Sequence, residues 1–155
     1  MTTNKAMILT HVGLTLPLIN GAGIYRQSVA TVFDEFKTYE DVGAAQLPAL
    51  CYFAAKGGMN PPRYELHNSP EKTFDFMVIG HVAATTQAER VLRLGELEED
   101  VRRALMIDPT RGNWAVDTIQ IEDQDDDSGV PNKEGLKGNT GTATWRFRCT
   151  YFPND

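Results

Sequence analysis

The apolar residues near the start of the chain recur at helical spacing and predict an amphipathic helix over Ala6–Ile19. Its apolar stripe consists of Leu9, Val12, Leu16 and Ile19, which lie on one face of a helix. Pro17 lies in the last turn, where a proline ends or kinks a helix. With Lys5 before it, the segment resembles a secretion signal, but His11 interrupts it and it is too short to span a membrane. We therefore expect this helix to pack on the core.

Shorter apolar segments after this helix predict strands. Ile24–Val29 and Arg63–His67 are expected to form short strands, and Leu47–Ala55, which proline and glycine residues flank, a buried strand. Residues Ala30–Gln46 mix acidic, aromatic and small side chains without a clean period, which indicates a long and partly irregular loop. Because unusually long loops often carry function, we expect this loop to contact a partner. The candidate contact residues are Asp34, Glu35, Phe36 and Tyr39.

Two long alternating segments predict the centre of a sheet. Along Lys72–Thr85, Phe74 and Phe76 fall on one face, and Met77 and Ile79 fall on the other. Because both faces carry apolar residues, this strand is expected to be covered on both sides. Thr140–Phe152 alternates more strictly, which predicts an antiparallel sheet with one face buried. Its buried side is expected to consist of Trp145, Phe147, Cys149 and Tyr151, and its other side of Thr144, Arg146, Arg148 and Thr150.

The clearest helical pattern covers Gln87–Ile107. Thr86 and Glu89 form a capping box, which marks a helix start, and Asp108–Pro109 ends the helix. Its apolar stripe consists of Ala88, Val91, Leu94, Leu97, Val101, Ala104 and Leu105. After this helix, Trp114–Glu122 is predicted as a strand and Asp123–Asn139 as a polar hairpin loop.

The order of helix, strands, helix and strands predicts an α+β fold: a mostly antiparallel β-sheet packed by two α-helices, with long polar loops. A chain of 155 residues corresponds to a single domain, residues 1–155. It is long enough to bury a core without a disulfide or a metal. Cys51 and Cys149 are therefore expected to be small buried hydrophobic residues in a reducing cytoplasm.

Composition narrows the class of protein. An apolar fraction of 41% and a charged fraction of 23% exclude a mostly disordered, collagen-like or coiled-coil chain. The formal net charge of −6 disfavours non-specific binding to nucleic acid, because the phosphate backbone is itself negative. For the same reason, docking to an anionic membrane is disfavoured.

The negative charge is concentrated in a segment that no basic residue interrupts. It contains Asp117, Glu122, Asp123, Asp125, Asp126 and Asp127. Asp123, Asp125, Asp127 and Glu134 occupy positions one, three, five and twelve of a calcium loop, but Ser128 stands where that loop needs glycine. The flanking segments are also predicted strands rather than helices. We therefore expect a solvated acidic loop without a metal. The alternative is a negatively charged surface that acts through its field rather than through a bound ion.

The arginines form two groups with two possible roles. Four follow the polar side of the second helix, Arg90, Arg93, Arg102 and Arg103, and two lie in the last strand, Arg146 and Arg148. They are either solvated faces with ordinary ion pairs or one half of a subunit contact with the acidic loop. Arginine suits such contacts because its planar fork pairs with both oxygens of a carboxylate. A closed ring of identical subunits requires two different, complementary patches on each subunit.

No local motif indicates an enzyme. His11, His67 and His81 do not form a metal-binding spacing. The serines lack a nucleophile elbow, the cysteines lie in no known reactive motif, and Gly21 with Gly23 has no phosphate-binding lysine after it. We therefore expect no catalytic residue, cofactor or metal, although a site assembled from distant residues stays open.

The assembled pattern resembles the tail terminator (tail completion) proteins of long-tailed bacteriophages. The resemblance covers most of the chain as an order of elements. Its most specific motifs are the Leu47-Pro48-Ala49-Leu50 strand and the helix exit Val101–Thr110 (VRRALMIDPT). The N-terminal helix with the Tyr25-Arg26 step after it, the Trp114–Glu122 strand and the Trp145–Tyr151 strand also carry it. Residues Ala30–Gln46 depart from the family, whose linker there is more compact.

This resemblance implies a structural α+β subunit that forms a ring, typically a hexamer, at the top of the tail tube. Such a ring stops tube polymerisation and offers a docking face to the head. The implied partners are further copies of the chain, the tail tube protein, a neck or connector protein and, in contractile phages, the last sheath ring. The implied location is the virion tail or neck, and the host cytoplasm during assembly. Asp123, Asp125, Asp126 and Asp127 would line a lumen through which DNA slides without specific binding.

Two other interpretations stay open. The first is a head–tail connector or neck adaptor of similar build. The second belongs to a different class and is a small acidic metal-binding module or an enzyme.

Overall fold

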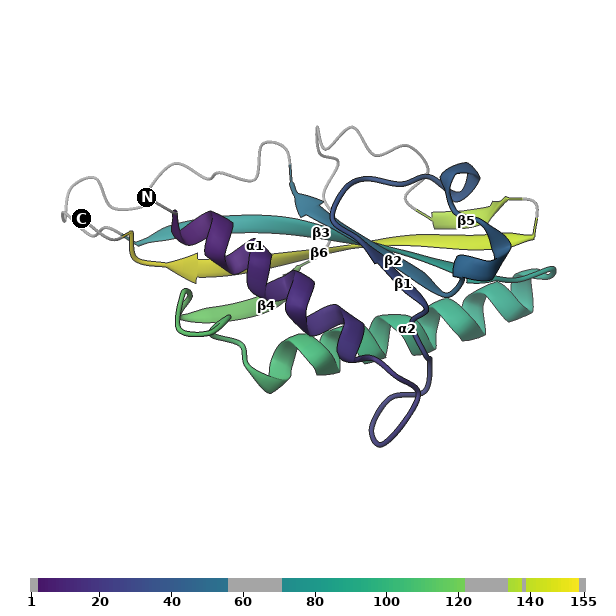
Figure 1. The fold of residues 1–155 in the computed structure, drawn as a ribbon, viewed down its shortest axis with the longest axis horizontal. Coiled ribbons are helices and arrows are strands. Elements are labelled where there is room, and N and C mark those ends of the chain that lie inside the picture. The colour runs from purple at the N-terminus through teal and green to yellow at the C-terminus, as the bar shows by residue number, and fades with distance from the viewer. Residues whose placement is uncertain (1–2, 56–70, 122–133, 138, 154–155) are drawn as a thin grey trace.

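A computed structural model describes residues 3–55, 71–121, 134–137 and 139–153 of the chain, with the backbone alone described at 134–137. Two α-helices, three short 3-10 helices and six strands occur in these residues (Figure 1). In chain order they are α1 Asn4–Thr15, η1 Leu16–Leu18, β1 Thr31–Phe33, η2 Tyr39–Asp41, η3 Ala44–Gln46, β2 Ala49–Ala54, β3 Lys72–Ala83, α2 Gln87–Ile107, β4 Asp117–Ile121, β5 Glu134–Lys137 and β6 Thr140–Tyr151.

The strands form one sheet in the order β1-β2-β3-β6-β4, and β5 also pairs with β6. β1 and β2 are parallel, and the other pairs are antiparallel. The centre of the sheet is the pair of β3 and β6, whose register runs from Lys72↔Tyr151 to Ala83↔Thr140. The predicted α+β fold with a mostly antiparallel sheet is therefore confirmed.

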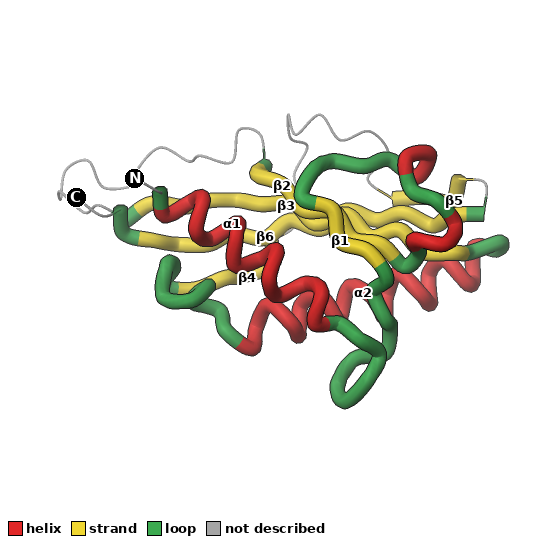
Figure 2. Tube along the Cα trace, viewed as in Figure 1, coloured by secondary structure: helices red, strands yellow, loops and turns green. Residues whose placement is uncertain are grey.

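Both helices pack on one face of this sheet, which we call the core face (Figure 2). The core contains buried residues of α1 such as Ile8 and Val12, of α2 such as Leu97, and of the sheet such as Phe76 and Phe147. The rings of Phe76 and Phe147 stack with their centroids 5.4 Å apart. The predicted apolar stripe of the first helix is confirmed at Val12, Leu16 and Ile19, whereas Leu9 is partly exposed and Ile8 is fully buried.

The predicted strand over Ile24–Val29 is wrong, because this segment forms a loop. Gly21 and Gly23 adopt positive φ angles, which glycine tolerates and an extended strand does not use. The backbone N–H groups of Arg26 and Gln27 donate to the carboxylate of Asp100 on α2 rather than to a neighbouring strand. The edge strand of the sheet is instead β1, which pairs with β2 and lies inside the predicted loop Ala30–Gln46.

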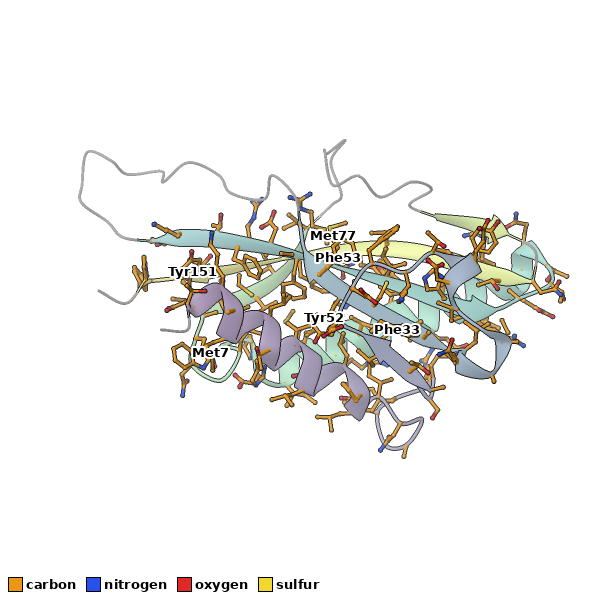
Figure 3. The ribbon with its side chains drawn as sticks, turned by 45° about the horizontal axis from the view of Figure 1, so that its top comes forward. Met7, Phe33, Tyr52, Phe53, Met77 and Tyr151 are labelled. Carbon is orange, nitrogen blue, oxygen red and sulfur yellow. The ribbon has the colours of Figure 1, made fainter. Side chains whose placement is uncertain are left out.

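The opposite side of the sheet, which we call the outer face, is also covered at β3. Met77, Ile79 and His81 are buried there, as predicted for this strand. Part of the cover comes from the segment between β1 and β2, since the carbonyl of Lys37 lies 2.9 Å from Nε2 of His81. In Figure 3, Tyr52 points from β2 towards α1, whereas Phe53 and Met77 lie on the other side of the sheet.

The prediction that β6 is buried on one face alone is wrong at Arg146. Trp145, Phe147 and Cys149 are buried on the core face as expected, but Arg146 on the outer face is buried too. It is buried because it pairs with Asp75 of β3, which no local pattern in β6 could reveal.

The predicted second helix is confirmed as α2 with the same bounds. Thr86 caps it, since its hydroxyl accepts the N–H of Glu89 at 3.2 Å. At its C-terminus, Arg111 is fully buried and donates to the carbonyls of Leu105 and Asp108. These two acceptors lie in the last turn, where helix carbonyls lack intrahelical partners.

The last predicted boundaries need two corrections. β4 begins at Asp117 rather than Trp114, because Arg111, Gly112 and Asn113 adopt positive φ angles and turn the chain there. β5 lies inside the predicted loop Asp123–Asn139 and pairs with the start of β6. The predicted strand Arg63–His67 lies outside the described residues.

Candidate functional site

The candidate acidic loop lies outside the described residues. This applies to Asp123, Asp125, Asp126 and Asp127, so their role in lining a lumen stays a prediction. Asp117 is the member of the acidic segment that is described, and it is exposed at the start of β4.

The candidate partner-contact loop lies over the outer face. Asp34, Glu35 and Phe36 are exposed, and Tyr39 is half-buried in η2. The ring of Phe36 meets the ring of Phe53 edge-on at 5.7 Å between centroids. Lys37 forms an ion pair with Glu35 at 3.0 Å. This loop therefore offers an aromatic residue and charges to solvent, while its backbone is bound to the sheet through His81.

The six candidate interface arginines do not form one continuous surface. On α2, Arg93 donates to the carbonyl of Ala83, and Arg103 contacts Glu99, Asp100 and the carbonyl of Ile24. Arg90 hydrogen bonds to Gln87, and Arg102 is exposed.

The other two, Arg146 and Arg148, lie on the outer face, on the far side of the sheet from α2. Both bind Asp75: Arg148 with two nitrogens at 2.7 and 2.9 Å, and Arg146 at 2.9 Å. Their role in a subunit contact stays a prediction, and their structural role is to neutralise a buried carboxylate.

A group of exposed apolar residues that sequence reasoning missed runs from the end of α1 into the loop before β1, and we call it the loop surface. It consists of Leu14, Leu18 and Ile24, whose exposed fractions are 69%, 61% and 55%. Leu14 and Leu18 lie out of phase with the buried stripe of Val12, Leu16 and Ile19. This spacing in the sequence could have predicted that both leucines are exposed. In Figure 1 the loop after α1 projects beyond α2 and away from the sheet. Leu14 and Leu18 precede this loop and Ile24 lies in it, so we treat all three as candidate contact residues.

The loop surface is held in place by Asp100. This carboxylate is fully buried and accepts the N–H of Arg26 at 3.0 and 3.1 Å and that of Gln27 at 2.7 Å. At the base of the loop, the N–H of Val29 donates to the carbonyl of Ile19 at 2.9 Å. The exposed leucine and isoleucine are thus carried on a segment with defined backbone geometry.

A groove lies on the other flank of α2, between α2, β4 and β6. Its volume is about 660 Å³. Its lining includes Met106, Ile119 and Trp145, and the indole of Trp145 is buried against Gly80 and Leu97 of the core. Glu98 and Arg102 lie at the helix side, where Glu98 accepts a hydrogen bond from Gln120 at 2.8 Å. Volumes of roughly 300–1,000 Å³ hold drug-sized ligands, so several side chains fit here.

Several buried titratable groups have shifted pKa values and structural partners. Burial lowers the pKa of His81, whose ring bonds to Thr142 and to the carbonyl of Lys37. Burial also raises the pKa values of Cys51 and Cys149 to about 11, so both stay thiols at neutral pH. Both cysteines are free and buried, as expected.

In the part of the chain that the structure describes, no three histidine, cysteine or acidic residues are placed to hold a metal ion. No helix within the same residues is long and apolar enough to cross a membrane. The comparison with protein-family models and with curated proteins gives no match to this chain.

Proposed function

We propose that the chain is a structural virion protein of the tail terminator type. Six copies form a ring that caps the tail tube, ends tail polymerisation and offers a docking face to the neck. The ring contacts the tube protein on one side and a neck or connector protein on the other, and DNA passes through its centre without specific binding.

The order of elements supports this proposal. The resemblance rests on Leu47–Leu50, the helix exit Val101–Thr110 and the last strand. Ala49 and Leu50 lie in β2 and Leu47 and Pro48 directly before it, while the other two segments belong to α2 with its C-terminal turn and to β6. Asp108 has a structural role in the helix exit. Its carboxylate accepts hydrogen bonds from the N–H groups of Thr110 and Gly112 and so stabilises the turn after α2.

One observation carries the proposal. The chain has two unlike surface features, the exposed Leu18 and Ile24 and, beside α2, the groove whose lining includes Met106 and Arg102. A self-complementary patch would give a closed dimer, whereas two different patches allow head-to-tail contacts that close into a ring.

Measurement of the assembled mass tests the proposal. Sedimentation of the purified chain together with negative-stain microscopy should give rings of defined size. Gold labelling of phage particles should place the protein where the tail tube meets the neck. A chain that stays monomeric at all concentrations and is absent from purified tails would contradict the proposal. Label above the neck would favour the head–tail connector.

A further inference from the structure

We infer that the Asn20-Gly21 step, in the loop after α1, is a site of spontaneous covalent modification. At this step the side-chain amide of Asn20 is converted to a carboxylate through a succinimide ring. The reaction needs only this chain and water, so the inference does not depend on a ring of subunits.

The sequence around Asn20 permits the reaction. Asn20 is the one asparagine of the chain that a glycine follows. Ring closure requires the backbone nitrogen of the next residue to reach Cγ of the asparagine, and a side chain on that next residue hinders the approach. Glycine has no side chain and the widest backbone freedom. Asn113 is also exposed in a turn, but it precedes the bulky Trp114.

The structure folds the Asn20 side chain over the peptide that follows it. Its Oδ1 accepts a hydrogen bond from the N–H of Ala22 at 3.0 Å, an arrangement by which asparagine stabilises turns. A bond to the N–H two residues further on places Cγ beside the intervening nitrogen, that of Gly21. Holding a nucleophile next to the atom it attacks accelerates a reaction. Asn20 is also exposed, in a loop that projects beyond α2 (Figure 1), so water reaches it.

The same hydrogen bond stabilises the charged intermediate. When the nitrogen of Gly21 attacks Cγ of Asn20, negative charge develops on Oδ1. The N–H of Ala22 already points at this oxygen and so acts as the donor of an oxyanion hole does. The loop therefore holds the electrophile, the nucleophile and a stabilising donor within three consecutive residues.

Water is the co-reactant in both steps. Hydroxide or water first takes the proton from the Gly21 nitrogen, and this nitrogen forms a bond to Cγ of Asn20. The bond between Cγ and Nδ2 breaks, and Nδ2 takes up a proton and leaves as ammonia. A second water molecule then opens the ring at either carbonyl, which gives aspartate or isoaspartate without an oxidant or a reductant.

The fold requires the glycine that makes this step reactive. Gly21 has a φ angle of +72°, and a Cβ atom there would lie 3.1 Å from Cβ of Ser28. Residues other than glycine rarely adopt such a φ angle, so a side chain at position 21 would be both strained and crowded. The test therefore changes Asn20 rather than Gly21.

The modification changes the loop that carries Ile24. Aspartate adds one negative charge, and isoaspartate also lengthens the main chain, because the chain then runs through the side-chain carbon. Asn20 forms a backbone bridge with Ser28, and beside it the N–H of Val29 donates to the carbonyl of Ile19 at 2.9 Å. A longer chain disturbs this pairing, so the isoaspartate form should have a looser loop.

Peptide mapping by mass spectrometry tests the inference. The folded chain is incubated at mildly alkaline pH, digested with trypsin and followed over time. Conversion at Asn20 should be at least about tenfold faster than at Asn113, since Asn113 lacks a glycine neighbour and the near-attack geometry. Fragmentation that separates aspartate from isoaspartate should find both products. Hydrogen exchange of the Val29 amide should be faster in the isoaspartate fraction.

Asn20→Gln is the matched control. Glutamine keeps an amide, but its longer side chain must close a larger ring, so this variant should keep its mass over the same period. A wild-type sample unfolded in urea measures the rate that the sequence alone supports. Retention of the amide at Asn20 in the folded chain overturns the inference, whether or not the urea sample converts. Equal rates at Asn20 and Asn113 overturn it too. These measurements do not involve the oligomeric state, so they leave the proposed ring untouched.

Discussion

The carboxylate of Asp75 is fully buried on the outer face and touches two guanidinium groups. Arg146 is 8% exposed and Arg148 is 26% exposed. Removing one partner of a buried ion pair leaves an uncompensated charge, which costs more than the pair itself gains. At the scale of single residues, the stability of the outer face therefore depends on the Asp75 carboxylate, which compensates the charge of the buried Arg146.

Asp75→Ala should destabilise the fold by about 3 kcal/mol, the lower end for a broken buried pair, since Arg148 keeps some contact with water. Urea unfolding followed by tryptophan fluorescence measures this change. The control is Glu35→Gln, which removes an exposed ion pair with Lys37 and should leave the midpoint almost unchanged. Equal midpoints for the two variants would contradict a structural role for Asp75.

His81 makes the stability of the fold depend on pH. Burial lowers its pKa in the folded state below the ordinary value of 6.5, so the unfolded chain binds a proton more readily. Neutral His81 therefore makes its full contribution to the free energy of unfolding above about pH 6.5. This contribution is lost as the pH falls towards the lowered pKa.

His81→Gln should flatten the dependence of the unfolding free energy on pH between about 7.5 and 5. Burial and the charge of Arg111 also lower the pKa of His11. His11 therefore makes its own contribution to the pH dependence of the unfolding free energy. His11→Gln is therefore the matched control and should leave the part due to His81 in place. An unchanged slope in His81→Gln would show that His81 does not titrate differently on folding.

At the scale of elements, α2 lies so close to the sheet that one strand position has no room for a side chain. A Cβ atom on Gly80 would lie 2.6 Å from the indole of Trp145 and 2.9 Å from Leu97. Gly80 thus allows β3 and α2 to approach closely, with the indole of Trp145 packed between them.

Gly80→Ala should cost about 1–3 kcal/mol, as overpacking of a core does. Gly95→Ala is the matched control, since its Cβ meets nothing within 4 Å, and it should stabilise the helix by about 1 kcal/mol. Thermal unfolding of both variants gives the comparison. A neutral Gly80→Ala would mean that Trp145 can move away from the strand.

At the scale of the whole molecule, the net charge is −6. Its effect on DNA would depend on where in the assembly the acidic residues lie. If the proposed ring forms, the segment with Asp123, Asp125, Asp126 and Asp127 is predicted to face its lumen, where it would repel the phosphate backbone. The same number of carboxylates elsewhere on the chain would not have this effect.

Replacing these four aspartates by asparagine should make assembled rings retain duplex DNA at low salt, and the retention should fall steeply as salt increases. A gel-shift titration measures this. The control removes four charges at Asp34, Glu35, Glu40 and Glu96 and should give little retention. Equal retention by both variants would show that net charge, rather than a lumen, controls the interaction.

Local patterns were sufficient for much of the fold. The bounds of α2, the positions of β3 and β6 and the α+β class follow from periodicity and caps, because these signals act between residues a few positions apart. The same locality explains the errors. Ile24–Val29 has the composition of a strand, but its N–H groups find Asp100, more than 70 residues away.

The sequence by itself determined which residues are apolar and at what spacing, and hence the helices, the central strands and the core face. Tertiary structure alone decided that Arg146 is buried against Asp75 and that the loop carrying Ile24 is fixed to α2 through Asp100. It also decided that Arg102 and Met106 of α2 line a groove together with residues of β4. Surfaces of this kind arise between elements that meet after folding, so no short-range pattern encodes them.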